Sequence, residues 1–260
     1  MSAWLATPVG ERLLADEAPY VAETARRFHG DTLLWAGCHT PLTDTVRGCM
    51  VRNRVFALDG SSPAGEGLTT FRCELDAIPL ANNALDGVLL HHALEMAEDP
   101  RTALRELSRV LAAGGRLTVV GFNPFSFWGV RIAYARVFRD SFSGLRLVSP
   151  ARLVDWLTVL GFELCEEVRF TAYNLPFRLG NTGEQDERST QQLIPSSWGP
   201  RLRNALDHLN PPVGGVYMVS AVKQALGVRR DWRLSAAREP KLAPVAYPKL
   251  SARNRIERSR

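Results

Sequence analysis

The sequence predicts an α/β fold with a mostly parallel central sheet and helices on both of its faces. Strand-like and helix-like patterns alternate from residue 30 to about residue 170, which is typical of parallel strands joined by crossover helices. Residues 85–90 form an apolar run of the kind found in strands that are buried on both faces. With 260 residues, of which 45% are hydrophobic, the chain can bury the core of one large domain.

The clearest single element is the helix that begins after Asp99-Pro100. Asp99 can cap its first turn, and a proline is tolerated in that turn because the turn's N–H groups have no partner inside the helix. Apolar residues then recur at helical spacing, which gives the helix one apolar face: Ala103, Leu104, Leu107, Val110 and Leu111. We expect Gly114-Gly115 to end this helix and residues 116–120 to form the next strand.

The other elements are predicted from shorter patterns. Helices are expected at 9–28, 125–139 and 151–160, and strands at 32–36, 54–58, 69–73, 85–90, 162–170 and 215–223. Residues 180–200 are polar and irregular, and we expect a mobile insertion there.

The positive charge of the chain is concentrated near its C-terminus. Residues 227–260 contain ten Lys and Arg against three Asp and Glu, a balance of +7, so the total of +5 leaves −2 for residues 1–226. The sequence therefore predicts a folded domain over 1–226 and a basic, disordered tail over 227–260. Two roles stay open for the tail: a solubilising segment, or an electrostatic tether to nucleic acid or another polyanion.

Several features favour a cytoplasmic protein without a membrane partner. The N-terminus lacks a basic segment followed by an apolar run, so no signal peptide is expected. No apolar run approaches the roughly 18–20 residues that span a bilayer. Four cysteines are widely spaced and have no histidine at zinc-like spacing, so we expect reduced thiols and no metal site: Cys38, Cys49, Cys73 and Cys165.

A set of residues in the second quarter of the chain carries a family resemblance. The residues are Ile78-Pro79-Leu80, Asp86, Leu104-Arg105-Glu106-Leu107, Arg109-Val110-Leu111 and Gly114-Gly115. This pattern closely resembles the core of class I, S-adenosylmethionine-dependent methyltransferases of the type 11 group, strongly over 70–121 and weakly over 30–61. The resemblance implies a Rossmann-like class I methyltransferase fold, S-adenosylmethionine as cofactor, and methyl transfer to an acceptor that the sequence does not identify.

The resemblance places the first cofactor motif at Gly37-Cys38, where both residues would contact the cofactor. In the family, an acidic residue stands two positions before this glycine, and further glycines stand two and four positions after it. Here those positions hold Trp35, His39 and Pro41. The chain therefore lacks the usual partner of the methionine ammonium group and two glycines that let the backbone approach the cofactor.

Three further residues are predicted cofactor contacts. Asp59 ends the second strand 22 residues after Gly37, about the spacing at which a carboxylate binds a ribose; the alternative is an ordinary turn aspartate. Glu74 and Leu75 follow the third strand, where the family places an acidic residue near the adenine. For Glu74, the alternative is a carboxylate in a surface loop.

The candidate catalytic residues follow the fourth strand. His91, His92 and Glu95 would lie beside the methyl group, where a general base could remove a proton from the acceptor. His91 would also contact the cofactor. The alternative is that a histidine here is packed and hydrogen-bonded without a catalytic role.

Two hypotheses about the function of the whole chain follow from these residues. The first is a methyltransferase, with Phe125, Phe127 and Trp128 lining an acceptor pocket or belonging to the core. The second is a catalytically inactive, methyltransferase-like binding or regulatory protein, which the altered first motif favours and which could associate with nucleic acid through the tail.

Overall fold

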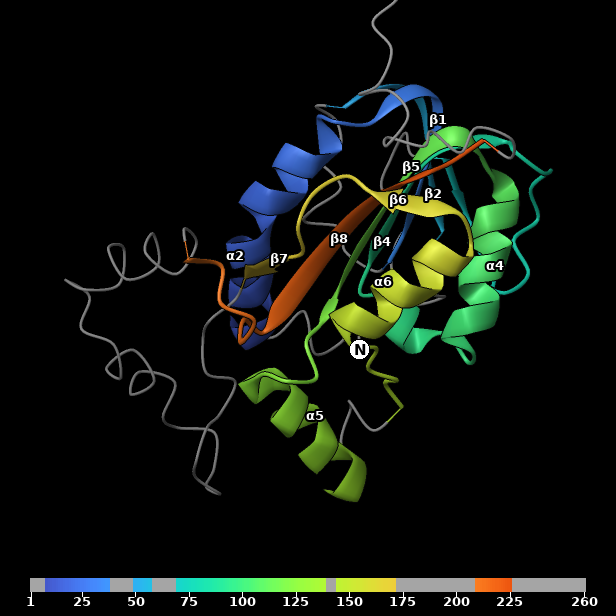
Figure 1. Cartoon of the computed structure of the whole chain (residues 1–260). Coiled ribbons are helices and arrows are strands. Elements are labelled where there is room, and N and C mark those ends of the chain that lie inside the picture. Colours follow the sequence, from blue (N-terminus) through green and yellow to red (C-terminus); the bar gives the residue numbers. More distant parts are fainter. Residues whose placement is uncertain (1–7, 38–48, 58–68, 139–143, 172–208, 226–260) are drawn as a thin grey trace, which may run out of the picture. The chain divides into compact units, whose positions relative to one another are not determined.

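One sheet of eight strands forms the centre of the computed structural model (Figure 1). The structure describes residues 8–37, 49–57, 69–138, 144–171 and 209–225. All of these residues belong to one compact unit within residues 1–226.

The strands follow the order β3-β2-β1-β4-β5-β8-β6, and β7 pairs with β8. Five strands run parallel to one another: β1 (His29–Ala36), β2 (Met50–Ala57), β3 (Thr69–Phe71), β4 (Leu85–His91) and β5 (Leu111–Phe122). Three pair antiparallel: β8 (Val216–Lys223) with β5, and β6 (Phe162–Leu164) and β7 (Arg169–Thr171) with β8. The predicted mostly parallel sheet is confirmed.

Helices lie on both faces of this sheet (Figure 1). They are α2 (Pro8–Ala25), the short 3₁₀ helix η1 (Leu94–Met96), α4 (Pro100–Val110), α5 (Phe127–Phe138) and α6 (Pro150–Val159). Asp99 caps α4, because its carboxylate accepts the N–H of Arg101 at 3.0 Å, and Pro100 occupies the first turn as predicted. The Ser149 hydroxyl caps α6 in the same way.

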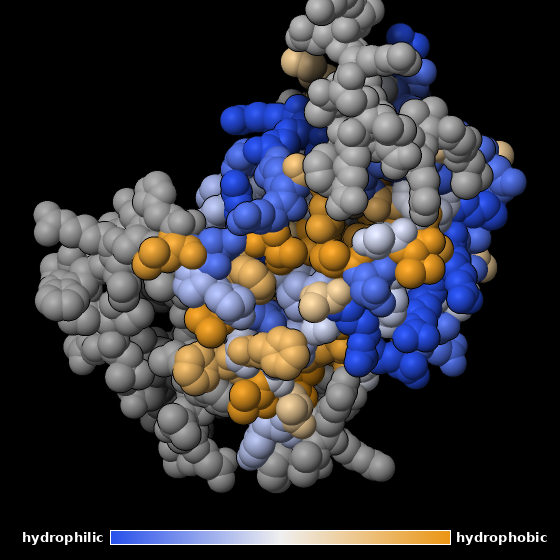
Figure 2. All heavy atoms as spheres, viewed as in Figure 1, coloured by the Kyte–Doolittle hydropathy of each residue, from blue (hydrophilic) through white to orange (hydrophobic). Residues whose placement is uncertain are grey.

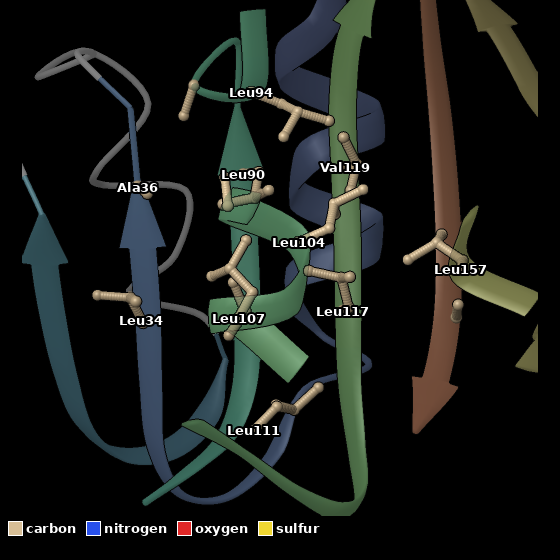
Figure 3. Packing of buried hydrophobic residues seen from close by; sticks show 14 of the residues in the cluster. Leu34, Ala36, Leu90, Leu94, Leu104, Leu107, Leu111, Leu117, Val119 and Leu157 are labelled. Atoms are coloured by element: carbon tan, nitrogen blue, oxygen red, sulfur yellow. The ribbon is translucent and has the colours of Figure 1, made fainter. Parts of the chain in front are cut away.

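Alternating residues of each central strand enter two separate hydrophobic cores. In β1, Leu33 and Trp35 face the core that α2 completes, whereas Leu34 and Ala36 face the opposite one. On that opposite face, Leu104 and Leu107 of α4 pack over the leucines and valines of the parallel strands (Figure 3). This period of two is the pattern expected of strands buried on both faces, so the carboxyl ends of the strands are held in fixed positions.

The predicted boundaries differ most from the structure at two places. Helix α4 ends at Val110, and Gly114-Gly115 lie within β5. The reason is that Leu111 is buried and pairs with Leu85 of β4, while Gly114, with φ of +81°, lies in an irregular stretch before regular pairing resumes. The expected strand 162–170 is divided into β6 and β7, which pair with different parts of β8.

Several predictions lie outside the described residues: the cofactor contacts Cys38 and Asp59, the insertion at 180–200 and the basic tail at 227–260. In the parts that are described, no helix is both long and apolar enough to cross a bilayer.

Candidate cofactor site at the carboxyl ends of the strands

The predicted site residues that the structure describes gather at one edge of the sheet. Gly37 follows β1, Glu74 and Leu75 follow β3, and His91 ends β4. These strands run in the same direction within one sheet, so their carboxyl ends lie at the same edge, where ligands of open α/β sheets bind.

Gly37 is required by the close approach of two strands. Its φ is +144°, a conformation that favours glycine. A Cβ added to Gly37 would lie 2.3 Å from the carbonyl oxygen of His91. The one glycine that remains of the first motif therefore has a packing role between β1 and β4, in addition to any contact with a cofactor.

Trp35 fills the position at which the family has an acidic residue. It is only 2% exposed. Its ring lies 5.9 Å from that of Phe56 and meets the His91 ring edge-on at 6.1 Å, centroid to centroid. The side chain is thus a core element of the α2 face and offers no carboxylate to a methionine ammonium group.

A buried polar cluster stands beside Trp35, and its central residue comes from the first helix. Glu17 of α2 places Oε2 2.7 Å from Nε2 of His91 and Oε1 3.1 Å from Nε2 of His92. All three side chains are at most 1% exposed. The carboxylate therefore ties α2 to the carboxyl end of β4 through two hydrogen bonds.

Glu95 extends this cluster toward β5. Its Oε1 accepts the N–H of Phe122 at 2.7 Å and lies 3.5 Å from Nδ1 of His92. Its Oε2 is buried and has no hydrogen-bond partner. Gly121 is needed here, because a Cβ at that position would lie 2.8 Å from Oε1 of Glu95 and 3.1 Å from the Tyr217 hydroxyl.

The charges of the cluster follow from its contacts. Burial disfavours the charged form of Glu17, but the two imidazoles outweigh it and lower the pKa of Glu17 to about 2. Burial likewise opposes protonation of His92, yet Glu17 and Glu95 raise the pKa of His92 to about 10. For His91, burial prevails and lowers the pKa of the ring. Glu17 and His92 thus form an ion pair beside a neutral His91.

The structure brings together all three predicted catalytic candidates, His91, His92 and Glu95, and adds Glu17, which the sequence analysis missed. One donor atom from each of Glu17, His91 and His92 lies within 4.8 Å of the others, a donor set that a divalent cation could accept. The 2.7 Å separation between His91 and Glu17 has the length of a charge-assisted hydrogen bond, so we interpret the group as an ion-paired cluster.

The loop after β3 is fastened to helix α4. Glu106 accepts the N–H of Ile78 at 3.0 Å, and Arg109 donates to the carbonyl oxygens of Leu80 and Ile78 at 2.9 and 3.1 Å. Two residues of the family resemblance, Glu106 and Arg109, therefore position a loop at the candidate site. In that loop, Glu74 is exposed and Leu75 is half-buried.

The aromatic residues after β5 divide between core and surface. Trp128 is buried and stacks on Phe122 with a centroid distance of 5.6 Å, whereas Phe125 and Phe127 are exposed. Asn123 accepts the N–H of Phe125 and so shapes the turn before α5, which begins at Phe127 rather than at Phe125.

Comparison with known families finds a match to one segment of the domain. Residues 47–119 match the type 11 methyltransferase family, described as a methyltransferase domain. The match runs from β2 into β5 and includes Glu106 and Arg109, which hold the loop after β3. This segment of the chain is therefore similar to the type 11 methyltransferases.

The relatives of this chain are similar to it in sequence over limited segments. An uncharacterized protein, YafS of Escherichia coli (strain K12), is 39% identical over 93 residues, which is 36% of this chain and 39% of YafS. The ubiquinone/menaquinone biosynthesis C-methyltransferase UbiE of Roseobacter denitrificans is 30% identical over 135 residues, 52% of this chain and 51% of UbiE. The alignments thus span about half or less of these relatives.

Solved structures extend the fold similarity over most of the chain. The putative methyltransferase in complex with the Trm112 activator of Haloferax volcanii aligns with a TM-score of 0.56 and 16% identity, covering 86% of this chain and 97% of that one. An S-adenosylmethionine-dependent methyltransferase from Mesorhizobium loti aligns with a TM-score of 0.53 and 15% identity, covering 80% and 97%. At these identities the likeness establishes the fold.

Proposed function

We propose that this chain is an S-adenosylmethionine-dependent methyltransferase with an acceptor still to be identified. The observation that carries the proposal is the type 11 methyltransferase match over 47–119, on a fold that aligns with solved methyltransferases. The cofactor would lie across the carboxyl ends of β1 to β4, with Gly37, Cys38, Glu74, Leu75 and His91 around it.

In this proposal Asp59 would hold the ribose of the cofactor. The chemistry that the cofactor supplies is an in-line displacement, in which the sulfur–methyl bond breaks as the acceptor–methyl bond forms. The protein contributes mainly by holding the acceptor close and by excluding water. If the acceptor has a proton to lose, His91 and Glu95 are the candidate bases; the predicted third candidate, His92, already carries a proton in its ion pair with Glu17.

The fit of the described residues to this cofactor is partial. Gly37 and Glu74 stand at the ends of β1 and β3, where the family contacts the cofactor. Trp35, however, leaves the methionine ammonium group without the carboxylate that the family provides. Glu17 and Glu95 are the buried carboxylates near the end of β4, and Glu17 is already paired with His92.

The proposal is tested through Asp59. A charge-assisted hydrogen bond is worth about 1.5–3 kcal/mol, so Asp59→Ala should weaken the binding of S-adenosylhomocysteine at least about tenfold, measured by isothermal titration calorimetry. Asp155→Ala, which removes an exposed carboxylate from α6, is the matched control and should leave the affinity unchanged. Equal affinity of both variants would remove Asp59 from the site.

A second candidate function is a methyltransferase-like binding or regulatory protein without catalysis. The specific observation in its favour is Trp35, which is packed into the core at the position of the missing acid. Native mass spectrometry of the purified protein separates the two functions. A co-purifying S-adenosylmethionine would argue against this second candidate.

A further inference from the structure

Three buried side chains from two distant parts of the chain direct their donor atoms to one place. Nε2 of His91 lies 2.7 Å from Oε2 of Glu17, and Nε2 of His92 lies 3.3 Å from the same oxygen. The three donor atoms all lie within 4.8 Å of one another, and each side chain is at most 1% exposed. Burial removes the water that would otherwise solvate these groups, so their charges must be balanced within the protein.

The separations of these donor atoms are close to those of a tetrahedral metal centre. Zn²⁺ forms bonds of about 2.0–2.2 Å to histidine nitrogen and carboxylate oxygen, and tetrahedral angles then place neighbouring ligand atoms roughly 3.3 Å apart. The distance from Nε2 of His92 to Oε2 of Glu17 is 3.3 Å. The 2.7 Å between His91 and Glu17 would lengthen by roughly 0.6 Å in such a centre. A water molecule or the second oxygen of Glu17 would take the fourth position.

A second carboxylate stands behind one of the two imidazoles. Oε1 of Glu95 lies 3.5 Å from Nδ1 of His92, the ring nitrogen that does not face Glu17. Glu95 is itself held in place, because the same oxygen accepts the N–H of Phe122 at 2.7 Å. Histidines that bind a metal through one ring nitrogen usually donate the other ring N–H to a carboxylate or carbonyl group. The position of Glu95 is therefore the one expected of a residue that orients a metal-binding histidine.

The charges of the four side chains also favour a divalent cation. Glu17 and Glu95 are only 1% and 2% exposed, and Oε2 of Glu95 is buried without a hydrogen-bond partner. A buried carboxylate is stable only when it is paired or coordinates a metal. With both imidazoles neutral, one divalent cation balances the two carboxylates, whereas the proton on His92 balances one of them.

We propose that Glu17, His91 and His92 bind a divalent transition-metal ion of the Zn²⁺ type, with Glu95 orienting His92. Imidazole nitrogens favour such ions over Mg²⁺ and Ca²⁺, which prefer oxygen ligands. Binding displaces the proton on Nε2 of His92 to solvent, and the proton on Nε2 of His91 moves to Nδ1 of the same ring. The ion pair between Glu17 and His92 is then the metal-free form of the same residues.

The metal site goes beyond the proposed methyl transfer, because it depends on the side chains around α2 and β4 and not on the cofactor. It would fasten α2 to the carboxyl end of β4 and would leave Glu95 as the candidate base in place of His91. It also replaces the sequence-based expectation that the chain has no metal site. That expectation rested on spacing along the chain, which does not report a ligand 74 residues away.

The test is the metal affinity of the full chain after EDTA treatment, measured by equilibrium dialysis against Zn²⁺ and by thermal unfolding. One Zn²⁺ per chain should bind, and Zn²⁺ at about 100 times its Kd should raise Tm by roughly 5–10 °C. Mg²⁺ should leave Tm unchanged. His91→Gln should weaken Zn²⁺ binding at least about a hundredfold, since even the residues that orient metal ligands are worth about 10–100-fold.

The matched control is His29→Gln, which removes an exposed histidine from the start of β1. Hydrophilic side chains occupy much of the described surface in Figure 2, so weak metal binding there is expected, and this variant measures how far an exposed histidine contributes. It should bind Zn²⁺ within about twofold of the unaltered protein. Glu95→Gln should lie between the two variants, with a loss of about 10–100-fold.

Co²⁺ in place of Zn²⁺ gives a spectroscopic readout of the unaltered protein. The loaded protein should show the visible absorption of a tetrahedral Co²⁺ centre, which decides the matter even if His91→Gln fails to fold. No Zn²⁺ binding by the unaltered protein, or the Co²⁺ spectrum of a six-coordinate hydrated ion, would overturn the proposal. Equal Zn²⁺ affinity of folded His91→Gln and His29→Gln would overturn it as well, because the metal would then lie elsewhere.

Discussion

Replacing Glu17 by glutamine should destabilise the fold strongly, although Glu17 lies in the first helix and far along the chain from its partners. The substitution keeps the volume and removes the negative charge that pairs with His92. Breaking a buried ion pair from one side costs about 3–5 kcal/mol, and we expect about 3 kcal/mol here because glutamine still fills the space. In a unit of this size that corresponds to a fall in Tm of roughly 6–12 °C.

The measurement is urea and thermal unfolding at pH 7, followed by circular dichroism. Glu11→Gln is the control, since Glu11 is an exposed residue of the same helix, and it should change the free energy of unfolding by less than about 1 kcal/mol. A double-mutant cycle with His92→Gln should give a coupling energy of about 1–3 kcal/mol. If Glu17→Gln proved as stable as Glu11→Gln, or if the coupling energy were zero, the ion-pair account of the cluster would be refuted.

Three further outcomes are expected. Gly37→Ala should cost at least about 2 kcal/mol in urea unfolding, since the added methyl group would meet the His91 carbonyl and φ would be strained; a neutral effect would contradict the close approach of β1 and β4. Arg109→Lys should increase proteolytic cleavage in the loop at 78–83, because one ammonium group cannot replace the several hydrogen bonds of the guanidinium. An unchanged cleavage pattern would contradict the role of Arg109 in holding this loop. The raised pKa of His92 stabilises the fold fully below pH 6.5 and progressively less as the pH rises toward about 10, so stability should fall between pH 7 and 8.5, and His92→Gln should flatten that slope.

The sequence predicted the fold well where local signals and tertiary packing agree. Helix α4 begins as predicted because Asp99 and Pro100 fix its start locally. Its end was misplaced, since the pairing of Leu111 with Leu85 depends on a strand 26 residues away and outweighs the glycine signal at 114–115. Local patterns cannot report such a contact.

The candidate site was predicted only in part, because some of its contacts join residues that lie far apart in the sequence. His91, His92 and Glu95 were found because they follow a recognisable strand. Glu17 was missed, because its contact with His91 spans 74 residues. A signal was nevertheless present: Glu17 lies on the apolar side of its helix, in line with Leu13 and Val21, and a carboxylate there needs a buried partner.

The central proposal, that this chain binds S-adenosylmethionine despite Trp35, is tested most directly by titrating the purified protein with S-adenosylhomocysteine in a calorimeter and in thermal unfolding. Ligand at about 100 times its Kd adds about 2.7 kcal/mol to the free energy of unfolding, which should raise Tm by roughly 5–10 °C. A shift of this size with micromolar binding is the predicted result. If millimolar ligand produced no heat and no shift in Tm, that result would contradict the claim. The fold would then be that of a non-catalytic binding domain.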